Sequence, residues 1–394
     1  MPAAIELSVL FVNYNSWGVL ADALGSLREN PPRAADGAPL AHEVVVVDNA
    51  SPLAPGDEVD RVRALLAGLP HGPGELVHAP ANGGYAAGMN LARSRARGRM
   101  LLVCNPDVLF LPGCVDGLLR YLEGHPEAGA AAPETFADTG LQCRLPTGRL
   151  PRLGDLPGLT LAALSARAVR RYARRRTPRY LPLWEARESI ELEMFAGWCF
   201  LIRAELVDEI GFFDERYPLY YEDADLSLRV RRAGRRIVQV AGSRLVHLYN
   251  RSGRTDPELA FARYRTSRRA YYRRWHGRAG ALLHDACERL LATAWARRRA
   301  VREPWSGVVE LDRSEGGPRL RLPRGSERFL VEVAFDPYFY LAAGAFGSGA
   351  EWAPGAGMLR EIDRPAWFRV VDLAGRALQE LGVYRYDPGG APDG

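Results

Sequence analysis

Short apolar runs alternate with longer segments of helical periodicity over the first part of the chain. The runs at residues 7–12, 44–47 and 100–104 are almost continuously hydrophobic, and residues 76–78 fit a further short strand between them. The first two are each followed by a polar turn and then by apolar residues three or four positions apart, which predict helices at 19–27 and 59–69. Continuously hydrophobic strands that alternate with helices are typical of a parallel sheet covered on both faces. The pattern therefore predicts an α/β fold.

Polar residues gather where these predicted strands end. They are Asn13 and Asn15, Asp48 and Asn49, Asn82 and Gly83, and Asn105 with Asp107. Such residues also form ordinary turns, so one loop of this kind indicates little. In α/β sheets, however, ligands bind at the carboxyl ends of the strands. Four such loops therefore favour a shared binding site at one edge of the sheet.

A cluster of acids stands out further along, in the stretch 214–229, D-E-R-Y-P-L-Y-Y-E-D-A-D-L-S-L-R. Glu222, Asp223 and Asp225 follow an aromatic run and precede a helical pattern. Carboxylates are well tolerated at a helix N-terminus, where one can cap the helix while the others remain solvated. The same arrangement suits a general base. The stretch alone leaves both interpretations open.

Composition narrows the class of protein. A chain of 394 residues with 47% hydrophobic and 25% charged residues is expected to fold, with more than one domain. It has no apolar run of membrane-spanning length and no signal-peptide pattern, so we expect a cytoplasmic protein. The five cysteines form no C-x-x-C pair and are expected to be buried. All 52 basic residues are arginine, which excludes a Schiff-base lysine and a P-loop lysine.

Three later regions differ from the first in pattern. Residues 154–182 mix leucines with many arginines and predict either an amphipathic helix on an anionic membrane or a surface helix. Residues 258–304 are helical and arginine-rich, but their charges are spread around the helices, so we expect no nucleic-acid partner. Residues 305–394 contain short apolar runs between Gly and Pro and predict a small β-rich accessory domain.

Taken in order, a set of motifs in this chain resembles glycosyltransferase family 2 proteins of the GT-A fold, most closely the rhamnosyltransferase-like branch. The motifs are V-N-Y-N-S (12–16), V-D-N-A-S (47–51), N-G-G-Y-A-A-G-M-N (82–90), C-N-P-D-V (104–108), G-F-F-D-E (211–215), Y-E-D-A-D-L-S-L-R (221–229) and His247 with Ser252. The resemblance implies a Rossmann-like mixed sheet in a GT-A domain at 1–257, with residues 154–182 as an insertion. A helical arm at 258–304 and the β-rich domain at 305–394 follow it.

The resemblance also assigns roles to individual residues. A nucleotide-sugar donor would be bound by Asn13, Asn15, Asp48, Asn49, Asn82, Gly83, Asn90, Asn105 and Asp107. A divalent cation, Mg or Mn, would be held by Asp107 and His247. Asn105 stands where the commonest form of the motif has an aspartate, so weaker metal binding is expected and strict metal dependence stays open. Gly197 and Trp198 would line the acceptor site.

The implied activity is that of an inverting glycosyltransferase of hexosyltransferase type. Asp223 would act as general base and Glu222 would support it, while Asp225 would pair with Arg229. The donor would be a UDP- or dTDP-sugar such as a rhamnose donor. The acceptor would be a carbohydrate or lipid-linked hydroxyl in cell envelope polysaccharide synthesis, which fits peripheral contact with the inner face of the membrane.

Other functions are less consistent with the sequence. A sugar nucleotidyltransferase needs a glycine-rich loop with basic residues near the N-terminus, and a nicotinamide dehydrogenase needs G-x-G-x-x-G after the first strand; neither is present. A non-catalytic glycan-binding or scaffolding protein that retains the fold stays open as the alternative. The sugar, the linkage, the oligomeric state and the role of residues 305–394 are not determined by the sequence.

Overall fold

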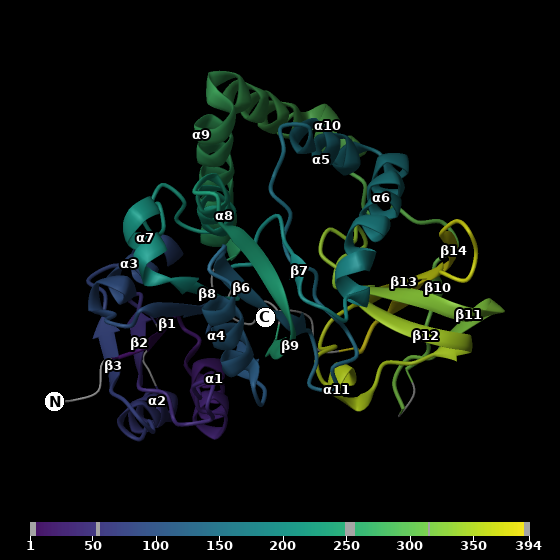
Figure 1. Ribbon diagram of the computed structural model, residues 1–394. Coiled ribbons are helices and arrows are strands. Elements are labelled where there is room, and N and C mark those ends of the chain that lie inside the picture. Colours follow the sequence, from purple (N-terminus) through teal and green to yellow (C-terminus); the bar gives the residue numbers. More distant parts are fainter. Residues whose placement is uncertain (1–4, 53–55, 249–256, 314–315, 390–394) are drawn as a thin grey trace. The chain divides into compact units, whose positions relative to one another are not determined.

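The computed structural model describes residues 5–52, 56–248, 257–313 and 316–389 (Figure 1). The chain divides into two compact units. Unit 1 comprises residues 1–134, 147–151 and 186–282, and unit 2 comprises residues 135–146, 152–185 and 283–394. The arginine-rich stretch predicted as an insertion in the first domain thus belongs to unit 2.

Unit 1 is built on a large mixed sheet with the strand order β3-β2-β1-β4-β8-β6-β9-β5, and β7 (Ile190–Glu191) also pairs with β9. The first four strands in sequence are parallel neighbours, as the hydrophobic runs predicted. They are β1 (Leu7–Asn13), β2 (His42–Asp48), β3 (Gly74–His78) and β4 (Met100–Cys104). The α/β fold with a Rossmann-like mixed sheet is therefore confirmed.

The other strands of this sheet are antiparallel additions. They are β5 (Val108–Phe110), β6 (Ala128–Phe136), β8 (Cys199–Arg203) and β9 (Arg236–His247). β6 was not predicted, because its run of Ala and Gly has low β propensity. β9 runs without interruption through the two apolar runs at 237–240 and 245–247.

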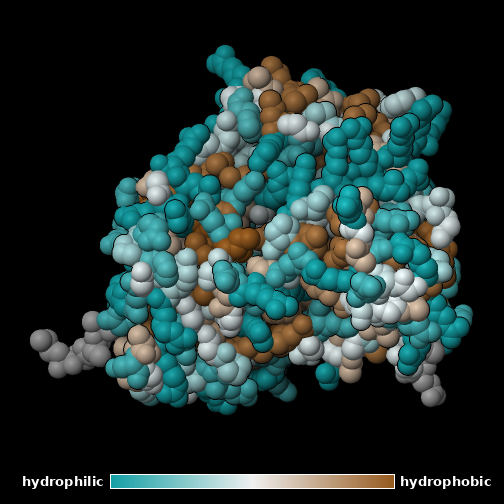
Figure 2. All heavy atoms as spheres, turned by 45° about the vertical axis from the view of Figure 1, so that its right-hand side comes forward, coloured by the Kyte–Doolittle hydropathy of each residue, from teal (hydrophilic) through white to brown (hydrophobic). Residues whose placement is uncertain are grey.

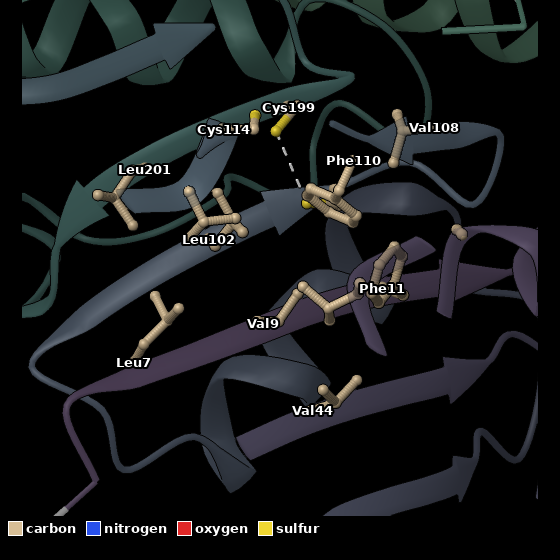
Figure 3. Close-up of a cluster of buried hydrophobic side chains, with 14 of the residues drawn as sticks. Leu7, Val9, Phe11, Val44, Leu102, Val108, Phe110, Cys114, Cys199 and Leu201 are labelled. Atoms are coloured by element: carbon tan, nitrogen blue, oxygen red, sulfur yellow. Dashed lines mark hydrogen bonds between the residues drawn. The ribbon is translucent and has the colours of Figure 1, made fainter. Parts of the chain in front are cut away.

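Helices cover both faces of the unit 1 sheet. Val9 and Phe11 of β1 point to the face covered by α1, α2 and α4, where β4 adds Leu102 (Figure 3). Gly88 of α3 packs against Val12, which alternation along the strand places on the opposite face. The helices of this unit are α1 (Trp17–Glu29), α2 (Asp57–Ala67), α3 (Tyr85–Arg95), α4 (Cys114–Gly124), α7 (Ala204–Ile210), α8 (Glu222–Arg232) and most of α9 (Pro257–Leu291), which is interrupted at Gly277.

All five cysteines are buried and free, as expected from their spacing. Cys104 and Cys199 face each other across the β4–β8 pair, with their sulfurs 3.8 Å apart, and a dashed line marks this contact in Figure 3. They belong to the core of the sheet.

Unit 2 contains a five-stranded sheet with the order β10-β14-β13-β11-β12, in which all neighbours are antiparallel except β10 and β14. The predicted C-terminal β-rich module is thus confirmed. Its strands are β10 (Val309–Glu310), β11 (Leu320–Ala334), β12 (Ala343–Trp352), β13 (Ala366–Asp372) and β14 (Gln379–Tyr386), and its helices are α5 (Asp155–Leu164), α6 (Ala166–Glu185), α10 (Ala294–Arg299) and α11 (Ala356–Leu359).

Helix α6 is fixed within unit 2 by a buried ion network. The Glu332 carboxylate lies 2.6 Å from Arg369 and 3.6 Å from Arg176, and all three side chains are buried. Thr177 donates to the same carboxylate over 2.9 Å. The apolar face of α6, including Trp184, packs in this interior, so only its arginine-rich face is open to other contacts. Among the described residues, no helix carries a stretch apolar and long enough to cross a bilayer.

Candidate active site

The parallel strands bring Asn13 and Asp48 together at the carboxyl edge of the unit 1 sheet. The two residues are register partners at the ends of β1 and β2. Asn13 Nδ2 donates to Asp48 Oδ1 over 3.1 Å, and Ser51 Oγ donates to the same oxygen over 2.5 Å. The other oxygen, Oδ2, lies 3.5 Å from His78 Nδ1 at the end of β3. This edge therefore holds an oriented carboxylate, a strong acceptor for a nucleobase N–H group.

The Ser51 hydroxyl also orders the loop after β1, because it accepts from the backbone N–H of Asn15 over 2.9 Å. Asn15 adopts a left-handed conformation with φ 53°, which asparagine tolerates better than most residues. Sequence reasoning placed Ser51 in a motif but gave it no role, because a serine in such a turn is common.

A second polar cluster joins the β2 end to the loop before α3. Asn49 Nδ2 donates to Asn82 Oδ1 over 3.1 Å and to the Gly84 carbonyl over 3.0 Å. Arg263 of α9 donates to the Asn82 side chain over 2.9 Å and to its carbonyl over 2.8 Å. Gly83 lies between these bonded residues. Arg263 was missed from the sequence because it is far away along the chain, in a helix where arginine is common.

The loop before α3 also contacts the segment that leads to the acids. Gly84 has φ 92°, and a side chain there would collide with the Pro218 carbonyl. The backbone N–H of Tyr85 donates to that carbonyl over 2.8 Å. Glycine at this position therefore permits a close backbone approach between the 82–90 motif and the segment that leads to the acids.

The acid pair stands at the start of α8, after an unusual backbone turn. Tyr220 and Tyr221 have φ values of 64° and 68°. A left-handed conformation costs free energy for bulky residues, and such strain is concentrated at functional sites. The turn delivers Glu222 and Asp223 as the first two residues of the helix. It could not be predicted from the sequence, since tyrosine carries no preference for this conformation.

Asp223 is held by backbone donors on both of its oxygens. Oδ2 accepts from the Gly197 N–H over 3.1 Å, and Oδ1 accepts from the Ala224 N–H over 2.8 Å. Burial raises the pKa of Asp223, and these backbone hydrogen bonds oppose the rise. The result is an oriented carboxylate that is more basic than an ordinary aspartate.

Glu222 differs from its neighbour. Its side chain is 5% exposed, and Oε2 is buried with no hydrogen-bond partner among the described residues. Burial raises the pKa of Glu222 well above the usual range, and the adjacent Asp223 carboxylate raises it further. Burial also raises the pKa of Tyr85, with Glu222 as the next contributor, while the Tyr85 hydroxyl donates to Gly197 over 3.3 Å.

The dipeptide Gly197–Trp198 links the acid pair to Asp107. Gly197 binds Asp223, while the Trp198 carbonyl accepts from the Asn105 N–H over 2.8 Å. The Trp198 ring stacks on His247 with centroids 5.1 Å apart. His247 Nε2 in turn lies 3.2 Å from Asp107 Oδ1.

The two ends of the site are therefore joined by direct contacts. Asp107 and His247 are both buried, with exposed fractions of 1% and 4%. Burial, followed by the Glu222 and Asp107 carboxylates, raises the pKa of Tyr220, which indicates that Tyr220 lies near both ends.

The donor set at Asp107 and His247 fits a divalent cation. One carboxylate oxygen and one imidazole nitrogen lie close enough to bind one ion together, and such ions often take their remaining ligands from water and substrate phosphates. Within the described ranges, no group of three or more His, Cys, Asp or Glu side chains could hold a metal. Ser252, which completes the motif of His247, lies outside the described residues.

Two further polar residues of the motifs are used in holding the structure. Asp225 accepts from Arg229 Nε over 2.8 Å and from Trp275 Nε1 over 2.9 Å, and it is fully buried. The pairing with Arg229 confirms the expectation for this acid. Asn90, predicted to bind the donor, exchanges hydrogen bonds of 2.9 and 3.2 Å with the Phe213 backbone, so its amide positions the segment before the acids.

The fold and the site together define a class of protein. It is an α/β domain whose strands end in polar residues suited to binding a nucleotide. A buried pair of carboxylates lies beside a carboxylate and an imidazole that could bind a metal ion. Comparison with known proteins identifies the family. The profile described as Glycosyl transferase family 2 matches residues 8–211. The chain belongs to this family.

Two characterised relatives cover parts of the chain. N-acetylglucosaminyl-diphospho-decaprenol L-rhamnosyltransferase of Mycobacterium tuberculosis is 31% identical over 175 residues, which are 42% of this chain and 52% of that protein. O-antigen biosynthesis protein RfbC of Myxococcus xanthus is 29% identical over 259 residues, 62% of this chain and 18% of that protein. The chain thus spans about half of the length of the first relative and less of the second.

Among solved structures, the mannosyltransferase PcManGT from Pyrobaculum calidifontis, in complex with GDP-Man and Mn²⁺, is similar. It shares 18% sequence identity with this chain at a TM-score of 0.44, and the match covers 75% of this chain and 72% of that one.

Proposed function

We propose that this protein is an inverting glycosyltransferase that moves a sugar from a UDP- or dTDP-sugar to an acceptor hydroxyl, with Asp223 as the general base. The observation that carries the proposal is the setting of Asp223. Its carboxylate is oriented by two backbone donors, has a raised pKa, and is linked through Gly197–Trp198 to the Asp107–His247 pair.

In this reaction the acceptor hydroxyl loses its proton to Asp223 while its oxygen attacks the anomeric carbon of the donor. The bond from that carbon to the diphosphate oxygen breaks, and its electron pair leaves with the nucleoside diphosphate. Single displacement inverts the configuration at the anomeric carbon. A base with a pKa raised toward neutrality suits this proton transfer better than an ordinary aspartate.

Glu222 has a supporting role in the proposal. Its raised pKa keeps it protonated to higher pH than an ordinary glutamic acid, so it adds less negative charge beside Asp223. Burial of two ionised neighbouring carboxylates would be costly, and one protonated member avoids that cost.

The donor would be held at the sheet edge. Asp48 would accept a hydrogen bond from the imide N–H of uracil or thymine, and Asn13 and Ser51 hold that carboxylate in place. Asn15, Asn49, Asn82 with Gly83, and Asn105 would complete the donor site. Asp107 and His247 would hold a Mg or Mn ion, which when bound supplies positive charge that stabilises the departing diphosphate.

For the acceptor, we propose a sugar on a lipid diphosphate, with Gly197 and Trp198 beside it. The support is the name of the Mycobacterium tuberculosis relative, whose substrate is N-acetylglucosaminyl-diphospho-decaprenol and whose transferred sugar is L-rhamnose. The proposal includes work at the inner face of a membrane in envelope polysaccharide synthesis.

A thermal-shift panel of nucleotide sugars tests the donor assignment. Binding to the folded state raises the melting temperature with ligand concentration. UDP- and dTDP-sugars are expected to stabilise the chain and GDP-sugars are not. Asp48→Asn should lose this preference, whereas Asp36→Asn, a change in an exposed turn, should keep it. Equal responses to all bases in the parent protein would contradict the role of Asp48.

A further inference from the structure

Unit 2 exposes large apolar side chains beside a run of arginines. Leu161 of α5 is 60% exposed, Leu290 at the end of α9 is 42% exposed, and Trp295 of α10 is 52% exposed. Arg297, Arg298 and Arg299 follow Trp295 directly and are exposed as well. We call these residues the α5–α10 patch: Leu161, Leu290, Trp295, Arg297, Arg298 and Arg299.

Hydrogen bonds hold this part of unit 2 together. The Val301 N–H, two residues after α10, donates to the Ala163 carbonyl of α5 over 3.0 Å. Thr293 caps α10 by accepting from the Ala296 N–H over 3.1 Å. Ala296 is the buried residue of this short helix, so the neighbouring tryptophan and arginines are left on its outer side. Figure 2 shows brown apolar areas among teal ones at the upper edge, at the height of α5 and α10 in Figure 1.

The stretch of sequence that carries most of the patch has charge of one sign. From residue 289 to residue 302 the chain carries five arginines and no acidic residue, and Glu288 and Glu303 flank this stretch. The Arg299 guanidinium lies 5.2 Å from the centre of the Trp295 ring. A tryptophan with an arginine on its face presents an apolar body and a cationic group to the same partner.

We propose that the α5–α10 patch is a docking surface for an anionic phospholipid bilayer. Trp295, Leu161 and Leu290 would enter the boundary between headgroups and acyl chains, and the arginines would contact lipid phosphates. A second copy of the chain is a poor occupant, because it would bring the same positive charge. Nucleic acid offers no counterpart for exposed leucines.

This surface extends the proposed function, since it would hold the enzyme at the membrane where a lipid-linked acceptor resides. Of the stretch 154–182 it includes only Leu161 of α5, because the apolar face of α6 is buried within unit 2. The proposal concerns binding alone, so its test needs neither donor nor acceptor.

The test is cosedimentation of the full chain with vesicles of phosphatidylcholine containing about 30% phosphatidylglycerol, compared with pure phosphatidylcholine. Each arginine near an anionic surface contributes about 1 kcal/mol, or about fivefold in partitioning. Changing Arg297, Arg298 and Arg299 to Gln should lower partitioning on the order of 100-fold. Trp295→Ala should lower it several-fold while leaving the salt dependence intact.

Matched controls lie elsewhere in unit 2. Changing the exposed Arg319, Arg360 and Arg376 to Gln removes the same charge, and Leu378→Ala removes an exposed apolar side chain; both should partition like the parent. Failure of the parent to bind the anionic vesicles at low salt would overturn the proposal. Equal losses of vesicle binding in the patch and control variants would also overturn it. So would patch variants that bind vesicles like the parent but no longer bind an acidic polypeptide. If the parent binds the anionic vesicles as expected but transfers no sugar, the proposed function is contradicted and the docking surface is not.

Discussion

Replacing Glu222 by Gln should stabilise the protein above neutral pH. The change keeps the size and shape of the side chain but removes its ability to ionise. In the folded chain Oε2 is buried without a hydrogen-bond partner among the described residues, and Asp223 is its neighbour. An ionised Glu222 is therefore stabilised by water in the unfolded chain far better than in the folded one.

The sign of the effect with pH follows from the direction of the pKa shift. Burial and Asp223 raise the pKa of Glu222 in the folded state, so the folded chain binds its proton more tightly than the unfolded chain does. The contribution of protonated Glu222 to the free energy of unfolding is fully present below its pKa in the unfolded chain. It is lost as pH rises through the raised pKa of Glu222 in the folded chain. Gln cannot ionise and therefore avoids this loss. The gain in stability of the variant over the parent should be largest at high pH and should shrink as pH falls.

The magnitude comes from the charge on the buried carboxylate, because a Gln amide at the same place would be equally unpartnered. An unpartnered buried group costs more when it is charged than when it is neutral, here by on the order of 1–3 kcal/mol. At about 2–4 °C per kcal/mol for a unit of 150–250 residues, the melting temperature should rise by about 2–12 °C at pH 8. The assay is calorimetry or thermal fluorescence at pH 8 and pH 5.

A matched control for this prediction is Glu209→Gln, which makes the same chemical change at an exposed position of α7. It should shift the melting temperature little at either pH. A Glu222→Gln variant that is less stable than the parent at pH 8, or equally shifted at both pH values, would refute the reasoning.

Three other outcomes follow from the site. The acid limb of the transfer rate should lie at a higher pH than that of an ordinary carboxyl, because burial raises the pKa of Asp223 and the base must be ionised; a pH profile of kcat/KM checks this. Gly84→Ala should destabilise unit 1 by about 1–3 kcal/mol, measured by denaturant unfolding, because its side chain would meet the Pro218 carbonyl at a positive φ. Asp225→Ala should cost about 3–5 kcal/mol in the same assay, because it removes the carboxylate that balances the buried Arg229 charge and the acceptor of Trp275 Nε1.

These predictions have distinct controls. Gly25→Ala in α1 introduces a side chain with no atom within 4 Å and should stabilise the helix slightly, in contrast to Gly84→Ala. An acid limb near pH 4 would contradict a raised pKa for the base. A loss under 1 kcal/mol for Asp225→Ala would contradict its role as the buried partner of α8 and α9.

The sheet edge could be predicted from the sequence because parallel strands repeat a simple rule. Continuous apolar runs indicate the strands, and the carboxyl ends of parallel strands meet at one edge, so the hydrophobic pattern predicts that Asn13 and Asp48 lie at the same edge of the sheet. The structure adds that they are register partners on neighbouring strands. The Asp225–Arg229 pair follows from helical spacing in the same way.

Features that depend on long-range packing could not be predicted. Arg263 reaches Asn82 from a helix far along the chain, and the Tyr85 hydroxyl donates to the carbonyl of Gly197, 112 residues away in the sequence. The amphipathic pattern of residues 154–182 indicates that one face is buried but not what covers it. Glu332 and Arg369, which fix that helix in unit 2, lie in strands with no local sign of such a role.

We have proposed Asp223 as the general base of a nucleotide-sugar-dependent transferase. The most direct measurement compares Asp223→Asn with the parent for transfer from dTDP-rhamnose to a short-chain N-acetylglucosaminyl-diphospho-polyprenol, together with donor binding by calorimetry. We expect turnover to fall at least about 100-fold, the range of a lost general base, with donor affinity within about twofold of the parent. Turnover close to that of the parent, with the variant folded and binding donor, would contradict it.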